Sequence, residues 1–144
     1  AITEEDIKLL VSNAQEANIF HLVDAIFEQK IKKATEALEN LKINGASAGY
    51  IIAMIARQLR FIIQLKDLKS RGEKDPEIRK KLGLNSDFVW RKTLNQASFF
   101  PIDRFKDIFR KLLSTDMAIK TGQMDETTAV DLLIAELSSK HSTN

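Results

Sequence analysis

The stretch from Ser47 to Arg71 constrains the fold more than any other part of the chain. It contains no proline, and Gly72 follows it directly. Ser47 can accept hydrogen bonds from the free N–H groups of a first helical turn, and Gly72 can adopt the left-handed conformation that ends a helix. The stretch therefore predicts one long helix over residues 47–71.

The two halves of this helix differ in polarity. Residues 50–56 are apolar on every side, which in a soluble protein indicates neighbours all round and a central position. Further on, polar side chains recur at intervals of three and four and form one stripe, made of Arg57, Arg60, Gln64, Asp67 and Arg71. We expect the first half to lie in the core and the second half to expose this stripe.

The composition also favours helices over strands. The 144 residues include two prolines, five glycines and no cysteine, so disulfides, thiolate metal sites and cysteine nucleophiles are excluded. A chain of this length can bury a core without such cross-links. We expect an all-α fold, a compact orthogonal bundle of about eight helices around the long central helix.

Capping residues predict where the other helices begin and end. Thr3 and Asp6 have capping-box spacing, which predicts a helix over residues 4–12, and Asn18 is expected to cap a second helix. Later helices are expected to begin at Asp75 with Pro76, at Asn85 or Ser86, at Pro101 and at Asp125, and helix ends are expected at Gly83 and Gly122.

Neither a membrane span nor an export signal is indicated. The longest uncharged run, residues 43–56, is shorter than the ~20 apolar residues that cross a bilayer. The N-terminus is acidic and lacks the basic and apolar regions of a signal peptide. We therefore expect a cytoplasmic protein with no membrane partner.

Charge is unevenly distributed along the chain. The net charge is +2, yet residues 51–92 hold eleven Lys and Arg against five Asp and Glu, and residues 1–50 hold five against eight. A local basic surplus can attract a polyanion, although the simpler interpretation of such a run is a solvated helix face.

Catalytic chemistry finds little support. The sequence has two histidines, His21 and His141, and a structural role explains His21 more simply than a role as ligand or base. The phosphate-binding loop, the dinucleotide-binding glycine motif, the zinc-protease motif and the nucleophile elbow are all absent. We expect no catalytic, cofactor-binding or metal-binding residue, no cofactor, and no enzyme activity of this chain by itself.

Residues 75–97 have the spacing of a helix-turn-helix, with a turn at Gly83. The positions expected to pack are Ile78, Leu82, Leu84, Val89 and Leu94. The side chains that could meet phosphates are Arg79, Lys80, Lys81, Arg91 and Lys92, and those that could reach base edges are Asn95 and Gln96. Because the second helix also carries Phe88 and Trp90, packing of two helices explains the pattern better than direct DNA contact does.

A carboxylate is expected near the core in a later helix. Asp116 follows Phe105, Phe109 and Leu112 along one apolar stripe. Burying it unpaired would cost several kcal/mol, so it needs a cation, either Lys120 four residues on or an arginine of the long helix, Arg57 or Arg60. We hypothesise that this ion pair fastens the helix of Asp116 to the long helix.

Four segments, taken together, resemble a known family. They are residues 18–26, Ala-Arg-Gln-Leu-Arg at 56–60, Lys-Leu-Gly-Leu at 81–84, and Asp-Met-Ala-Ile-Lys-Thr-Gly at 116–122. In this order they resemble the C-terminal part of the delta subunit of bacterial DNA polymerase III, over residues 2–137. In the last segment we take Asp116, Ile119, Lys120, Thr121 and Gly122 as a structural motif.

The resemblance implies a function in clamp loading. In that family an AAA+-like N-terminal module grips the sliding clamp, a lid domain follows, and a helical collar domain joins the other subunits of a hetero-pentamer that places the clamp on primed DNA. For this chain it implies the end of the lid or a leading helix at residues 1–12, a collar or oligomerisation domain at 13–140 and a frayed tail at 141–144. The sliding clamp is expected to bind only through the N-terminal module, which this chain lacks.

The basic surface is where contacts with other subunits or with nearby DNA are expected. The candidate residues are Arg57, Arg60, Lys66, Arg71, Lys80, Lys81, Arg91 and Lys92. The alternative function is a helix-turn-helix DNA-binding module centred on residues 75–97.

Overall fold

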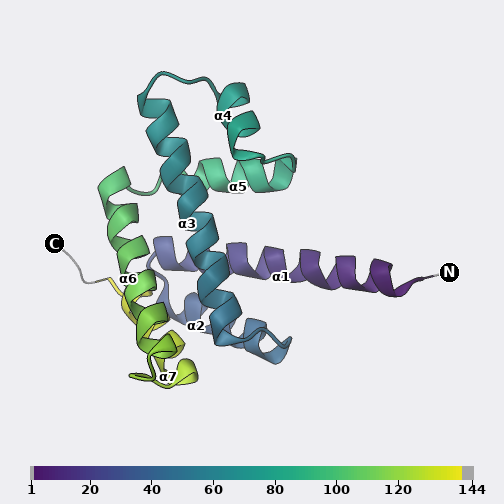
Figure 1. The fold of residues 1–144 in the computed structure, drawn as a ribbon, viewed down its shortest axis with the longest axis vertical. Helices are drawn as coiled ribbons and strands as arrows, with labels where there is room; N and C mark the ends of the chain where they lie inside the picture. Colours follow the sequence, from purple (N-terminus) through teal and green to yellow (C-terminus); the bar gives the residue numbers. More distant parts are fainter. Residues whose placement is uncertain (1, 141–144) are drawn as a thin grey trace. The chain divides into compact units, whose positions relative to one another are not determined.

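The computed structural model describes residues 2–140, and for residues 8–13 it describes the backbone alone. All regular secondary structure in this range is helical, which confirms the all-α prediction. The helices are α1 (Glu4–Phe27), α2 (Ile31–Ile43), α3 (Ala48–Ser70), α4 (Asp75–Leu82), α5 (Asp87–Ala97), α6 (Ile102–Lys120) and α7 (Glu126–Ser138) (Figure 1). The described range thus contains seven helices, where about eight were expected.

The difference arises in α1. Thr3 caps it as predicted, because its Oγ1 accepts from the Asp6 N–H at 3.1 Å and Asp6 Oδ2 accepts from the Thr3 N–H at 3.1 Å. The two helices expected at residues 4–12 and after Asn18 are one helix. No proline or glycine lies between them, and the low helix propensity of two asparagines does not stop a helix. The boundary predicted after residue 12 therefore falls inside α1, and the predicted tail at 141–144 lies outside the described residues.

Contacts divide the chain into two compact units. Unit 1 comprises residues 1–51 and 126–144, and unit 2 comprises residues 52–125. The helix α3 begins in unit 1 and continues through unit 2.

In unit 1, α1, α2 and α7 pack against one another. Their inward faces carry fully buried side chains at helical spacing, among them Leu22 and Val23 of α1, Leu41 of α2 and Val130 of α7. At the edge of this core, Lys42 of α2 donates to Asp131 Oδ1 of α7 at 2.5 Å. The described part of unit 1 therefore has an apolar core, with the Lys42–Asp131 ion pair joining α2 to α7.

Unit 2 is built on the longer part of α3. In Figure 1, α4 and α5 lie on one side of this segment and α6 on the other. The core contains Leu59, Ile62 and Leu65 of α3 together with Ile78, Phe105 and Leu112 from the other helices, each at most 1% exposed. Pro101 precedes α6 and Gly122 follows it with φ +76°, as predicted.

The predicted boundaries of α3 are confirmed, and its expected burial is partly wrong. Ser47 Oγ accepts from the Tyr50 N–H at 3.1 Å, and Gly72 has φ +89°. Ile51, Ile52 and Ile55 are buried, but Ala53 is exposed and Met54 is half-buried, so this half is not enclosed all round. Exposing the small side chain of an alanine to water costs little free energy. A run of apolar residues therefore does not require that every one of them is buried.

Among the described residues, α3 is long and apolar enough to cross a membrane. Half of its most apolar window is buried against the rest of the chain, and the exposed Arg57 and Arg60 lie in the same helix. Both features are typical of a core helix in a water-soluble fold.

Candidate subunit and nucleic-acid interface

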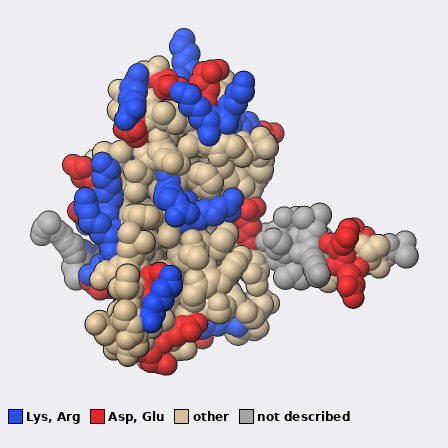
Figure 2. Space-filling view, viewed as in Figure 1, with Lys and Arg blue, Asp and Glu red and all other residues tan. Residues whose placement is uncertain are grey.

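The predicted contact residues all belong to unit 2. This unit contains 16 Lys and Arg against nine Asp and Glu, whereas unit 1 contains six against eleven. Figure 2 shows Lys and Arg side chains gathered over α3, around α4 and along α6, with acidic side chains between them near α4. The basic surplus is therefore a property of unit 2, and it extends beyond the middle third of the sequence to α6.

The polar stripe of α3 is exposed as predicted. The Arg57 guanidinium lies 5.2 Å from the ring centroid of Phe61, one helical turn away, which holds the arginine along the helix surface by a cation–π contact. Arg60 is exposed, and Arg71 pairs with Asp67 at 3.2 Å in an exposed i,i+4 bridge. Arg57 and Arg60 are thus available to a partner at the surface.

Lys66 is engaged inside unit 2. Its Nζ donates to the Ala97 carbonyl at 2.8 Å and lies 5.8 Å from the ring centroid of Phe105. The ammonium group therefore links α3 to the end of α5 and the beginning of α6. It points away from the arginine stripe, so we do not retain Lys66 as a surface contact.

The helix-turn-helix arrangement is present in α4 and α5. Gly83 ends α4 with φ +70°, and Ser86 caps α5 by accepting from the Val89 N–H at 3.3 Å. Ile78 and Leu84 are buried, while Leu82, Val89 and Leu94 are half-buried. The predicted cap at Asp75 is wrong: Asp75 is the first residue of α4, and Lys74 before it makes no side-chain cap.

Arg79 stabilises the turn of this arrangement. Its Nε donates to the Leu84 carbonyl at 2.7 Å, and its Nη2 donates to the Asn85 carbonyl at 2.9 Å and to Asp87 Oδ1 at 2.6 Å. The fork-shaped guanidinium suits several acceptors at once. Arg79 is therefore committed to the turn and is not presented to phosphate.

Gln96 was predicted to reach base edges, and this is wrong. It is fully buried, and Gln58 of α3 donates from Nε2 to Gln96 Oε1 at 3.0 Å and to Thr93 Oγ1 at 3.0 Å. The side of α5 that carries Thr93 and Gln96 faces α3, because these polar groups find partners there. The overlooked signal for this network was the position of Gln58, three residues after the buried Ile55 and four before the buried Ile62, on the inner face of α3. Asn95 is exposed.

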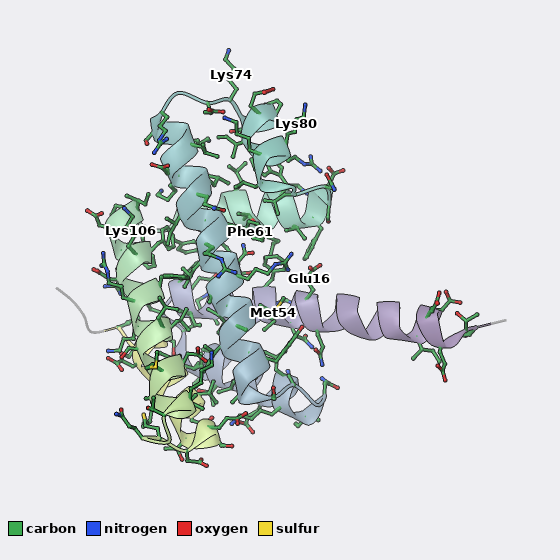
Figure 3. All side chains as sticks on the ribbon, in the orientation of Figure 1. Glu16, Met54, Phe61, Lys74, Lys80 and Lys106 are labelled. Atoms are coloured by element: carbon green, nitrogen blue, oxygen red, sulfur yellow. The ribbon has the colours of Figure 1, made fainter. Side chains whose placement is uncertain are left out.

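The remaining candidates of α4 and α5 differ in availability. Lys80 is exposed in the last turn of α4, and Figure 3 shows Lys74, just before α4, and Lys80 projecting outward. Lys81 pairs with Glu73 at 2.6 Å, Arg91 is exposed with its Nε 3.3 Å from the Asp87 carbonyl, and Lys92 is half-buried. Lys80 and Arg91 are consequently the more accessible cations of this part.

The motif at residues 116–122 forms the end of α6. Asp116 Oδ2 lies 2.7 Å from Lys120 Nζ, and the side chains are 31% and 69% exposed. The hypothesis that an Asp116 ion pair fastens this helix to α3 is therefore wrong, because the pair is local and near the surface. Thr121 Oγ1 donates to the Met117 carbonyl at 2.8 Å, and the Gln123 N–H donates to the Ala118 carbonyl at 2.8 Å, so the motif terminates the helix.

The side chains that the structure describes include no group of three or more His, Asp or Glu that could hold a metal ion. A groove of about 470 Å³ lies between α1 and α2 in unit 1, and His21, Asp24 and Glu36 are among its lining residues. In unit 2, the features that stand out are the exposed cations and the helix ends that position them. The class that the described residues define is an all-helical domain with a cation-rich surface in unit 2.

Comparison with known proteins gives the family. The family model for the C-terminal domain of the DNA polymerase III delta subunit matches residues 16–137, and the chain belongs to this family. The chain is 27% identical over 143 residues to DNA polymerase III subunit delta of Bacillus subtilis strain 168, covering 99% of the chain and 41% of that protein.

A solved structure, that of the Bacillus subtilis DNA clamp loader delta protein, superposes with a TM-score of 0.80 at 28% identity. The match covers 95% of this chain and 40% of the other. The chain thus spans about two fifths of the length of both relatives.

Proposed function

We propose that this chain is the domain through which a clamp-loader delta subunit assembles with the other clamp-loader subunits, in the cytoplasm. The observation that carries the proposal is the match of nearly the whole chain to the C-terminal domain of the delta family, in sequence and in fold. In this role the domain is the delta contribution to a hetero-pentameric collar. It has no chemistry of its own, and it acts in loading the sliding clamp onto primed DNA.

The exposed cations of unit 2 are the proposed contact residues. They are Arg57, Arg60, Arg71, Lys80, Lys81 and Arg91, and we add Lys92, which is half-buried. Arginines at an interface combine charge with a planar, weakly hydrated group, and they are frequent among residues that dominate binding. We give Arg57 and Arg60 the first place, because both are exposed on one stripe of a well-anchored helix.

The second candidate function is DNA binding through α4 and α5, favoured by the helix-turn-helix form of residues 75–97. Two findings weigh against sequence-specific reading. Gln96 faces α3, and Arg79 is committed to the turn. The cations left to this surface, Lys80 and Arg91, suit phosphate contacts, which carry no sequence information.

The proposal also assigns residues 1–12 to the junction with a preceding lid domain. In its support, the family match begins only at residue 16. The continuity of α1 across this point means that such a junction would be helical.

The test is co-purification with another subunit of the same clamp loader. We expect the natural protein to retain this subunit, and the Arg57→Glu, Arg60→Glu double variant to retain it about tenfold less well. The matched control is Lys32→Glu with Lys33→Glu, which reverses two exposed charges in the first turn of α2. Failure of the natural protein to bind any clamp-loader subunit would overturn the proposal.

A salt titration with duplex DNA distinguishes DNA binding from subunit assembly. Phosphate contacts release counterions, so affinity falls steeply between about 50 and 200 mM salt when they dominate. Tight, salt-sensitive DNA binding that is lost in Lys80→Glu with Arg91→Glu, while subunit binding is absent, would favour the DNA-binding module.

A further inference from the structure

A second exposed surface lies on α6, outside the residues that sequence reasoning selected, apart from Lys120. We define the α6 stripe as Lys106, Arg110, Leu113, Met117 and Lys120, which recur at intervals of three and four and are all exposed. The opposite face of α6 carries the buried Phe105, Ile108 and Leu112. Lys106 marks the N-terminal part of the stripe in Figure 3, and Figure 2 shows basic side chains along this helix with acidic side chains beside them.

The centre of the stripe is apolar. Leu113 is 50% exposed and Met117 is 61% exposed, one helical turn apart. Single exposed apolar residues are common, whereas these two are adjacent on the outer face of one helix and form a small continuous apolar patch. The Met117 end is fixed by the helix terminus at Thr121 and Gly122 described above, so the patch is presented on a rigid element.

The ends of the stripe are cationic. Lys106 and Arg110 precede the apolar pair, and Lys120 follows it. Arg110 bonds to Asp107 at 2.7 Å and Lys120 pairs with Asp116 at 2.7 Å, both within the helix. Exposed pairs of this kind contribute little, so these cations can exchange their carboxylates for those of a partner.

We propose that the α6 stripe docks an acidic amphipathic helix of another clamp-loader subunit, an inference that rests on the proposed assembly function. Apolar residues at the centre with cations at both ends complement a helix with apolar residues at its centre and carboxylates around them. Nucleic acid fits less well, because phosphate groups are bound by cations and would leave the apolar side chains of Leu113 and Met117 without a favourable contact.

This fold itself contains a helix of the required kind. In α7, Leu132 is 56% exposed, and Glu136 lies one turn further along the same exposed face. A neighbouring subunit with a similar domain would bring such a helix to the α6 stripe by a head-to-tail contact, the arrangement that generates rings.

The test is an affinity measurement with the purified clamp-loader subunits, using the natural full-length protein at about 100 mM salt. The first variant is Leu113→Ser with Met117→Ser, and the second is Lys106→Glu with Arg110→Glu. We expect each to weaken binding to one partner subunit about tenfold, and the charge variant also to lower the association rate. Because all four side chains are exposed, the variants should fold, which circular dichroism verifies.

Matched controls give the result its meaning. Ile43→Ser changes an apolar side chain that is 79% exposed, and Lys32→Glu with Lys33→Glu reverses two charges elsewhere; we expect both to bind as the natural protein does. Natural-level assembly by both α6 variants would overturn this inference and leave the assembly function standing, whereas no assembly by the natural protein would overturn both.

Two other outcomes would also overturn it. One is a loss of DNA binding, with subunit binding unchanged, in the charge variant alone. The other is self-association of the chain that depends on Leu113 and Leu132, because the occupant would then be a second copy.

Discussion

Gln58 of α3 donates a hydrogen bond to Gln96 Oε1 of α5 at 3.0 Å, in the interior of unit 2. The same amide group donates to Thr93 Oγ1 at 3.0 Å, and Thr93 donates in turn to the Val89 carbonyl at 2.8 Å. A buried network of this kind fixes how two helices are aligned, because any sliding would leave polar groups without partners.

We therefore expect Gln58→Leu to destabilise the protein by about 1–3 kcal/mol, the usual cost of leaving buried polar groups unsatisfied. Urea denaturation monitored by circular dichroism measures this. The Gln58→Leu, Gln96→Leu double variant should lose less than the sum of the two single variants, since the groups that lost their partner are then both removed. Additive losses would mean that the two amides do not act together.

The ion pair between Lys42 and Asp131 makes a pH-dependent contribution to stability. The pKa of Lys42 is raised above 10.5, chiefly by its hydrogen bond to Asp131, with burial of the ammonium group acting in the opposite direction. A raised lysine pKa stabilises the folded state below pH 10.5, and this contribution is lost as the pH rises through the folded pKa. We expect Asp131→Asn to cost about 0.3–1 kcal/mol at pH 7.

The difference between Asp131→Asn and the natural protein should shrink as Lys42 loses its proton. Urea midpoints compared at about pH 8 and about pH 11.5 test this. The exposed Asp103→Asn serves as the control, and its effect should not depend on pH over this range. A constant difference for Asp131→Asn would show that the carboxylate acts by packing and not by charge.

Arg79 is expected to stabilise the turn between α4 and α5. Lysine has the charge but lacks the fork that reaches the Leu84 and Asn85 carbonyls and Asp87 together, so Arg79→Lys should cost about 1 kcal/mol. The neighbouring Lys80→Ala, at an exposed position, should stay within about 0.5 kcal/mol of the natural protein. Equal thermal midpoints for Arg79→Lys and the natural protein would contradict this role.

The pair of Asp116 and Lys120 should contribute little. An exposed i,i+4 pair is worth about 0.3–0.5 kcal/mol, so Asp116→Asn should lower the stability by no more than about that amount. High salt should remove the difference. A loss of several kcal/mol would restore the hypothesis of a buried ion pair between α6 and another helix.

The sequence was most informative where local chemistry decides the structure. Ser47 and Gly72 bound α3, Ser86 caps α5, and Gly83 and Gly122 end their helices, because a cap or a left-handed glycine acts within a few residues. The exposed stripe of Arg57 and Arg60 followed from helical periodicity alone.

The errors arose where a side chain's partner lies far away in the sequence. The sequence around Gln96 does not indicate that this residue accepts a hydrogen bond from Gln58, which lies 38 residues before it in the chain. Likewise, the sequence around Lys66 does not indicate that its ammonium group donates to the Ala97 carbonyl. The exposed pair of Leu113 and Met117 was missed for a related reason, because periodicity shows that a residue is apolar but does not show whether another helix covers it.

The uninterrupted course of α1 has a mechanical consequence. Its 24 residues correspond to a rod of about 36 Å, and its first described side chain in the core is Ile19. A segment joined at the Thr3 end would therefore be connected to the core through a continuous helix and not through a flexible linker. A displacement or rotation of that end would move α1 as a whole, together with α2, which packs against it.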